Sequence, residues 1–126
     1  MTVTVVNLKK MPKPDFRADR STALGNPFYM NRESERELVC DQYEAYFLGN
    51  LNPDVAPVGF LSELDKILQA AKKGDITIGC WCAPKRCHCD TIKEYIDSEV
   101  EDAKVKADEI YKILSAGEAL EVSDDT

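Results

Sequence analysis

The sequence predicts a small α/β domain of the Rossmann-like, three-layer kind, with a short, mostly parallel sheet and a long C-terminal helix. Three observations predict this class: β-branched runs at residues 2–7 and 76–79, helical apolar stripes between those runs, and a third stripe from residue 92 onward. Helices that separate two strands favour a parallel pair, because a parallel pair needs a crossover connection. The 126 residues suffice for one domain, expected over residues 1–117 with an acidic tail at 118–126.

The first half of the chain predicts one strand and one helix. Residues 2–7 (TVTVVN) are mostly β-branched, and Pro12 ends the predicted strand. Ser34 and Glu37 have the spacing of a capping box, which predicts that a helix begins there. The apolar face of that helix is formed by Val39, Tyr43, Tyr46 and Phe47.

The second half predicts a helix, a buried strand and the long helix. Phe60, Leu64, Ile67, Leu68 and Ala71 form the apolar stripe of the first of these. Gly74 is its expected C-terminal cap, and residues 76–79 (ITIG) then predict a buried strand. Helical periodicity continues from residue 92 almost to residue 117. Two strands make a thin sheet, so we expect another strand within residues 14–30 or 118–123, or one from a partner subunit.

Charge and hydropathy limit the function classes. The formal net charge is −7, which argues against general binding of nucleic-acid duplexes. Residues 1–20 nevertheless carry five basic and two acidic side chains, a surplus that could focus a small anion or be a chance cluster beside a solvated acidic helix. The chain has neither an apolar run of bilayer length nor the apolar core of a signal peptide, so we expect a cytoplasmic protein with reduced thiols.

Residues 76–92 (ITIGCWCAPKRCHCDTI) hold four of the five cysteines and the one histidine. This loop follows a predicted strand and enters a predicted helix, where α/β sheets place ligands and where a helix N-terminus favours an anion. Lys85 and Arg86 add positive charge, and Asp90 or Thr91 is expected to cap the helix. The first interpretation is therefore an anion-binding loop, and its alternative is a basic turn without a ligand.

A metal site is the second interpretation of the loop. Cys80, Cys82, Cys87, His88 and Cys89 offer more than the four ligands that zinc requires. The spacing of the first two cysteines differs from the usual zinc pairing, and the sequence holds no second half-site. Small thiols also pack well in a core. We therefore expect no cofactor, with zinc as the alternative.

Thiolate chemistry is the third interpretation. Cys80 and Arg86 have the C-x5-R spacing of cysteine phosphatases, in which the loop surrounds a phosphate and the arginine binds its oxygens. A helix N-terminus and nearby cations would activate the thiol, with His88 as its base. No general acid is evident, and a lone histidine at a helix start also serves as a capping residue. Whether the protein is an enzyme stays open.

Residues 20–28 (RSTALGNPF) form the other unusual segment. Gly25 gives backbone freedom, Asn26 precedes a proline that fixes the chain, and Arg20 offers a fork for a carboxylate or phosphate. Such groups on a loop indicate a binding function. The alternative is a structural turn whose apolar side chains fill the core.

These segments together resemble a known family. The matching pieces are Val6-Asn7, the segment at 20–28, the tyrosine-containing helix at 43–47 and the Cys-Trp-Cys-x-Pro-x-x-Cys-His motif at 80–88. They resemble the domain-of-unknown-function family catalogued as number 4326, which is found in phages and bacteria. The resemblance spans roughly residues 3–97 and leaves the acidic helix and tail beyond it unexplained. It implies a shared site and no established activity.

The sequence thus predicts that the two loops share a pocket for a phosphate-bearing small molecule, a nucleotide or nucleotide derivative. The expected ligand-binding residues are Arg20, Ser21, Gly25, Asn26, Trp81, Lys85 and Arg86, and any chemistry would use Cys80 with His88. The basic side chains would neutralise the anion, Asn26 would orient the ligand and Trp81 would stack on a base. The alternative is a phage-encoded interaction protein whose acidic helix binds a host protein, with a structural or zinc-binding Cys/His cluster. A homo-oligomer stays open.

Overall fold

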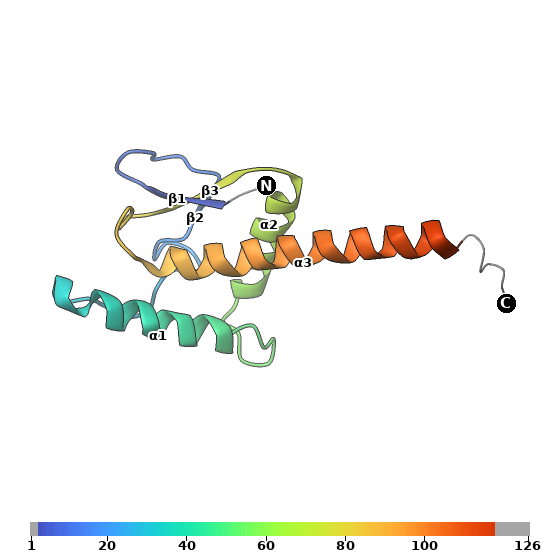
Figure 1. The fold of residues 1–126 in the computed structure, drawn as a ribbon. Coiled ribbons are helices and arrows are strands. Elements are labelled where there is room, and N and C mark those ends of the chain that lie inside the picture. The colour runs from blue at the N-terminus through green and yellow to red at the C-terminus, as the bar shows by residue number, and fades with distance from the viewer. Residues whose placement is uncertain (1–2, 118–126) are drawn as a thin grey trace.

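The computed structural model describes residues 3–117 and shows a three-stranded sheet packed against helices (Figure 1). The elements in chain order are β1 (Val3–Asn7), β2 (Phe16–Arg17), the 3-10 turn η1 (Glu33–Glu35), α1 (Arg36–Gly49), α2 (Phe60–Lys73), β3 (Ile76–Cys80) and α3 (His88–Gly117). The strand order is β1-β3-β2, and both outer strands run parallel to β3. The predicted α/β class, parallel sheet and long C-terminal helix are confirmed.

The core lies between the sheet and the helices. Ile76, Ile78 and Cys80 form the buried side of β3, as expected for the central strand of a parallel sheet. α3 contacts β1 and β3 on one side and α1 and α2 on others. The helices contribute their predicted apolar stripes, and the largest fully buried helical side chains are Tyr43, Phe47, Phe60, Ile67, Ile92 and Ile96.

The other side of β3 is covered by the β1–β2 connection. A Cβ atom added to Gly79 would lie 2.5 Å from Leu8 Cδ2 and 2.7 Å from Pro14 Cγ, so only glycine allows this close approach. Asp15 accepts a hydrogen bond of 2.8 Å from the Thr77 backbone and so holds the start of β2 beside β3. The strand expected within residues 14–30 is thus β2, while the alternative at 118–123 and the acidic tail lie outside the described residues.

The start of α1 differs from the prediction. Ser34 lies inside η1, α1 begins at Arg36, and neither N-terminus has a side-chain capping bond. Glu35, rather than Glu37, reaches back along the chain and accepts a hydrogen bond of 2.9 Å from the Asn31 backbone. The predicted capping box is therefore wrong, because Ser34 lies within the 3-10 turn, one residue before the N-cap position of α1.

α3 is the longest element and extends well beyond the rest of the described chain (Figure 1). Its first turn is stabilised by Asp90, whose carboxylate accepts a hydrogen bond of 3.1 Å from the Cys87 backbone, as expected for an acidic residue at a helix start. From Lys104 to Ser115 every side chain is exposed. Within residues 3–117, none of the helices has the combination of length and apolar character that crossing a lipid bilayer requires.

Candidate functional site

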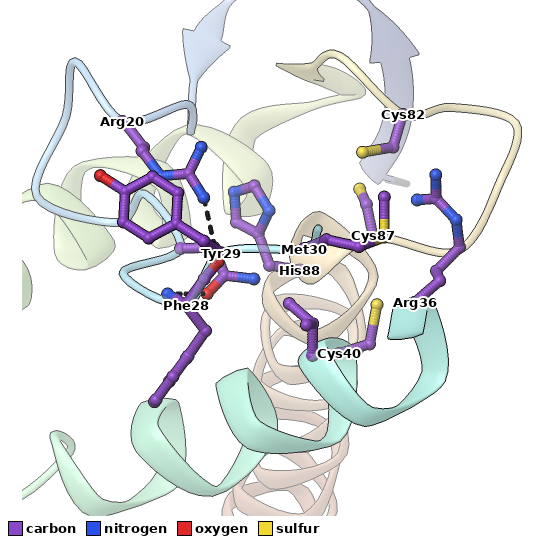
Figure 2. Close-up of a pocket in the computed structure, with 11 residues that line it drawn as sticks. Arg20, Phe28, Tyr29, Met30, Arg36, Cys40, Cys82, Cys87 and His88 are labelled. Carbon is purple, nitrogen blue, oxygen red and sulfur yellow. Dashed lines mark hydrogen bonds between the residues drawn. The ribbon is translucent and has the colours of Figure 1, made fainter. Parts of the chain in front are cut away.

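The segment at 20–28 and the cysteine loop meet at one cavity of ≈ 220 Å³ (Figure 2). α1 supplies the third wall. The lining residues are Arg20, Asn26, Phe28, Tyr29, Met30, Arg36, Val39, Cys40, Cys82, Cys87 and His88. They include two arginines and, among the described residues, no carboxylate. Residues 20–40 and residues 82–88, which are far apart in the sequence, thus share one cationic cavity.

Arg20 is held at the cavity by two interactions. Its Nη2 donates a hydrogen bond of 2.9 Å to the Phe28 carbonyl, and its guanidinium carbon lies 4.2 Å from the centre of the Tyr29 ring. Stacking on an aromatic ring suits a planar guanidinium and fixes its orientation. Asn26 is buried, and its Oδ1 accepts a hydrogen bond of 2.8 Å from the Phe28 backbone. The Asn26 carbonyl group therefore has a structural role in shaping the segment.

A tight turn around Arg20 holds the segment at 20–28 in its place at the cavity. Asp19 is buried and accepts hydrogen bonds from the Ser21 backbone, at 3.1 Å, and from the Ser21 hydroxyl. A Cβ added to Gly25 would lie 2.5 Å from the Asp19 carbonyl oxygen, so the turn requires glycine. Ser21 and Gly25, both predicted to bind ligand, thus shape the turn and do not line the cavity.

Arg36 and Cys40 complete the cavity and were not predicted from the sequence. They lie one helical turn apart on α1, so their side chains share a face. The Arg36 guanidinium donates to the Glu33 carboxylate and, at 2.8 Å, to the Arg86 carbonyl. Hydrogen bonds to Glu33 and then to Cys82 raise the pKa of Arg36 above its ordinary value. The i, i+4 spacing of an arginine and a cysteine was the available sequence signal.

Besides Ser21 and Gly25, three more predicted ligand-binding residues lie outside this cavity. Arg86 pairs with Glu37 at 2.7 Å and with Asp41 at 2.9 Å, so its charge is used to attach the cysteine loop to α1. Lys85 pairs with Glu33 at 3.3 Å. Trp81 is half-exposed and is not among the lining residues. The second arginine of the cavity is thus Arg36, in the place expected for Arg86.

His88 lies between the two arginines in Figure 2 and is buried. Because a carbonyl oxygen can only accept, the contact of Nε2 with the Ala18 carbonyl places the proton on Nε2. Burial lowers the pKa of His88, so the ring is neutral at pH 7. Its Nε2 also lies 3.8 Å from the Cys89 sulfur. The ring is therefore directed at Ala18 and Cys89, and it makes no hydrogen bond with Cys80 among the described contacts.

The cysteines of the loop form a compact thiol cluster. The sulfurs of Cys80, Cys87 and Cys89 all lie within 4.8 Å of one another, and all three residues are buried. The Cys80 and Cys87 sulfurs are 2.9 Å apart, and all five cysteines are free thiols. Hydrogen bonds from Cys82 and the neighbouring thiols hold the pKa of Cys80 below its ordinary value. This cluster could hold a metal ion, because thiolates bind soft and borderline metals.

A scan of family models gave a match, while neither a curated protein nor a solved structure matched the chain. The matching model is described as "Domain of unknown function (DUF4326)" and covers residues 4–98. This range contains both loops, α1 and the thiol cluster, and it ends just before α3 leaves the body of the molecule. The match covers well over half of the 126 residues. The chain therefore belongs to the DUF4326 family.

Proposed function

We propose that the protein binds the phosphate-bearing end of a small molecule, a nucleotide or nucleotide derivative, in the cavity between the two loops. The observation that carries the proposal is the pair of arginines, Arg20 and Arg36, that line one cavity without a lining carboxylate among the described residues. A guanidinium offers both charge and directed donors to phosphate oxygens. Arg20 would supply the donors. Arg36 is paired with Glu33, which offsets part of its charge, so it would contribute less to binding than Arg20.

The size of the cavity supports a small anionic group. Its ≈ 220 Å³ is below the ~300–1,000 Å³ of sites that hold drug-sized ligands. A phosphate or phosphorylated sugar fits within it, and a base would extend toward the rim. Tyr29 is exposed at that rim and offers an aromatic face, the role that the sequence predicted for Trp81.

Anion binding of this kind needs no resident cofactor, since the two guanidinium groups provide the charge. It also needs no bond to be made or broken. Five free thiols, four of them buried, favour a reducing compartment such as the cytoplasm.

Isothermal titration and thermal-shift assays with inorganic phosphate, AMP, ADP and a nucleotide sugar test the proposal. We expect binding of at least one phosphorylated compound and none of the matching nucleoside. Arg20→Gln should weaken binding about 10-fold or more, because a charge-assisted hydrogen bond is worth about 1.5–3 kcal/mol. Arg20→Lys should recover part of the loss by restoring charge without the planar fork.

Lys13→Gln is the matched control. It removes the same charge from an exposed residue of the β1–β2 connection, outside the lining set. If it weakens binding as much as Arg20→Gln does, the effect is general electrostatics and the cavity proposal is wrong. Absence of binding to every phosphorylated compound at millimolar concentration would also contradict it.

A protein-binding function is the second candidate, favoured by the exposed end of α3. Ile110, Tyr111, Ile113 and Leu114 are 56–71% exposed, which is unusual for neighbouring large apolar side chains. If the chain is phage-encoded, the partner would be a host protein. Binding to a basic host protein that is salt-sensitive, survives Arg20→Ala and Cys80→Ser, and is lost in Ile110→Asp would favour this function. Binding of nucleotide that is lost in the first two variants would favour the cavity.

A further inference from the structure

The thiol cluster has a geometry that packing alone does not require. Four of the five cysteines lie within ten residues, yet β3, the loop and the start of α3 bring their side chains together from different elements. The three sulfurs that lie within 4.8 Å of one another are buried. Cys82, on the loop, is half-buried and interacts with Cys80 and Cys87. Three sulfurs thus lie together at the strand end and the helix start, and the sulfur of Cys82, outside that group of three, interacts with two of them from the loop.

The distances fit one tetrahedral ion. Zn–S bonds are about 2.3 Å long, so sulfurs on one zinc ion are separated by roughly 3.8 Å. The 4.8 Å limit on the Cys80, Cys87 and Cys89 sulfurs agrees with that separation. Cys80 and Cys87, 2.9 Å apart, would have to separate by about 1 Å, which rotation about one Cα–Cβ bond provides. An iron–sulfur cluster is larger than a single ion and would force the sulfurs further apart.

The surroundings of the cluster argue against His88 as a metal ligand and would offset the negative charge of the thiolates. His88 directs Nε2 at the Ala18 carbonyl, so the ring is held by a bond outside the cluster. A zinc ion with four thiolates carries a charge of −2. The Arg36 guanidinium, which interacts with Cys82, and the N-terminus of α3, where Cys89 lies in the first turn, both stabilise negative charge.

We propose that Cys80, Cys82, Cys87 and Cys89 bind one zinc ion as a closed four-thiolate site. The ion would join the end of β3 to the start of α3, and it would hold Cys82 of the loop and His88 of α3 in the cavity wall. This is a structural site, since all four positions are filled by protein. It does not depend on anion binding, and each proposal can fail without the other.

Elemental analysis of protein purified without added metal or chelator tests the site. We expect about one zinc per chain, as for a structural site, and thermal unfolding at a lower temperature after a strong chelator removes it. Cobalt substituted for zinc should show the visible d–d bands of tetrahedral coordination and intense thiolate-to-cobalt charge transfer. Cys82→Ser should weaken zinc affinity at least 100-fold, since loss of an outer-shell partner alone costs about 10–100-fold.

Cys40→Ser is the matched control. Cys40 is a buried free thiol of α1 that also lines the cavity but lies outside the proposed ligand set. It should leave zinc content and the cobalt spectrum unchanged, with far-UV circular dichroism confirming that each variant is folded. The proposal is overturned if the folded wild type contains no zinc and binds no cobalt. It is also overturned if Cys40→Ser loses metal while Cys82→Ser keeps it, or if iron and sulfide are found in place of zinc.

Discussion

Gly25 and Gly49 differ in whether the fold leaves room for a side chain at their positions. A Cβ at Gly25 would lie 2.5 Å from the Asp19 carbonyl oxygen and 2.7 Å from Arg20 Cα, whereas nothing lies within 4 Å of one at Gly49. Gly25→Ala should therefore lower the free energy of unfolding by about 1–3 kcal/mol. Gly49→Ala, at the end of α1, should leave it unchanged or raise it by up to about 1 kcal/mol. Urea unfolding of both variants measures the difference, and equal effects would contradict the tight turn.

The Asp19 carboxylate gives a prediction about pH. Burial acts to raise its pKa, but hydrogen bonds from Ser21 and Arg17 outweigh burial and hold the pKa below the ordinary value of 3.8. Because the folded state binds the proton more weakly than the unfolded state, the carboxylate stabilises the fold above pH 4. This contribution is lost as the pH falls through the lowered folded pKa.

Asp19→Asn should therefore destabilise the protein at pH 7 by about 1.5–3 kcal/mol, the value of hydrogen bonds to a charged acceptor. The difference between wild type and variant should shrink as the pH falls below 4. Denaturant unfolding at pH 7, 5, 4 and 3 measures it. A difference that is constant across this range would show that the charge of Asp19 is not what holds the turn.

The sequence identified the segments that form the cavity more accurately than the individual side chains that line it. Arg20, Asn26 and His88 do line the cavity. They could be predicted because each lies in a segment of unusual composition. Arg86 was assigned from its spacing to Cys80, but spacing does not reveal that Glu37 and Asp41 of α1 bind it. Partners distant in sequence decide where a long cationic side chain points. Arg36 was missed for the same reason.

α3 combines two environments within one element. Ile96 is fully buried in the core, whereas Ile110, four turns later, is 56% exposed beyond the body. Ile96→Ala should lower the free energy of unfolding by about 2–5 kcal/mol. Ile110→Ala should change it by no more than about 0.5 kcal/mol, since no described core residue packs on it. Chemical unfolding of the two matched variants tests this division, and a large cost at Ile110 would mean that the exposed end has a partner in solution.

Elements were predictable from sequence where periodicity or capping is strong. The apolar periodicity of α2 and α3 predicted both helices correctly, and Gly74 ends α2 as expected. β2 has only two residues, too short for any alternation to show, and it forms because Asp15 attaches the chain to Thr77 of β3. The start of α1 was misplaced because Glu35 binds Asn31 inside a 3-10 turn that has no periodic signal.

The molecule as a whole is acidic, yet two of its arginines line the same cavity. The net charge of −7 opposes the approach of anions, while Arg20 and Arg36 attract them locally. Affinity for a phosphorylated ligand should therefore depend only weakly on salt, because long-range repulsion and local attraction are screened together. Titrations at 50 and 300 mM sodium chloride measure this. A loss of about 1,000-fold or more across this range would instead indicate the many phosphate contacts of a nucleic-acid-binding surface.

The segment at 20–28, the cysteine loop and α1 line one cavity, which we propose binds an anion. The most direct test is to add a phosphorylated nucleotide to 15N-labelled protein and to follow backbone amide and arginine Nε resonances. We expect the largest shifts on residues 20–30, on Arg36 and on residues 82–88, with the Nε signals of Arg20 and Arg36 among them. Shifts confined to the basic residues 9–13, or to the exposed end of α3, would contradict it.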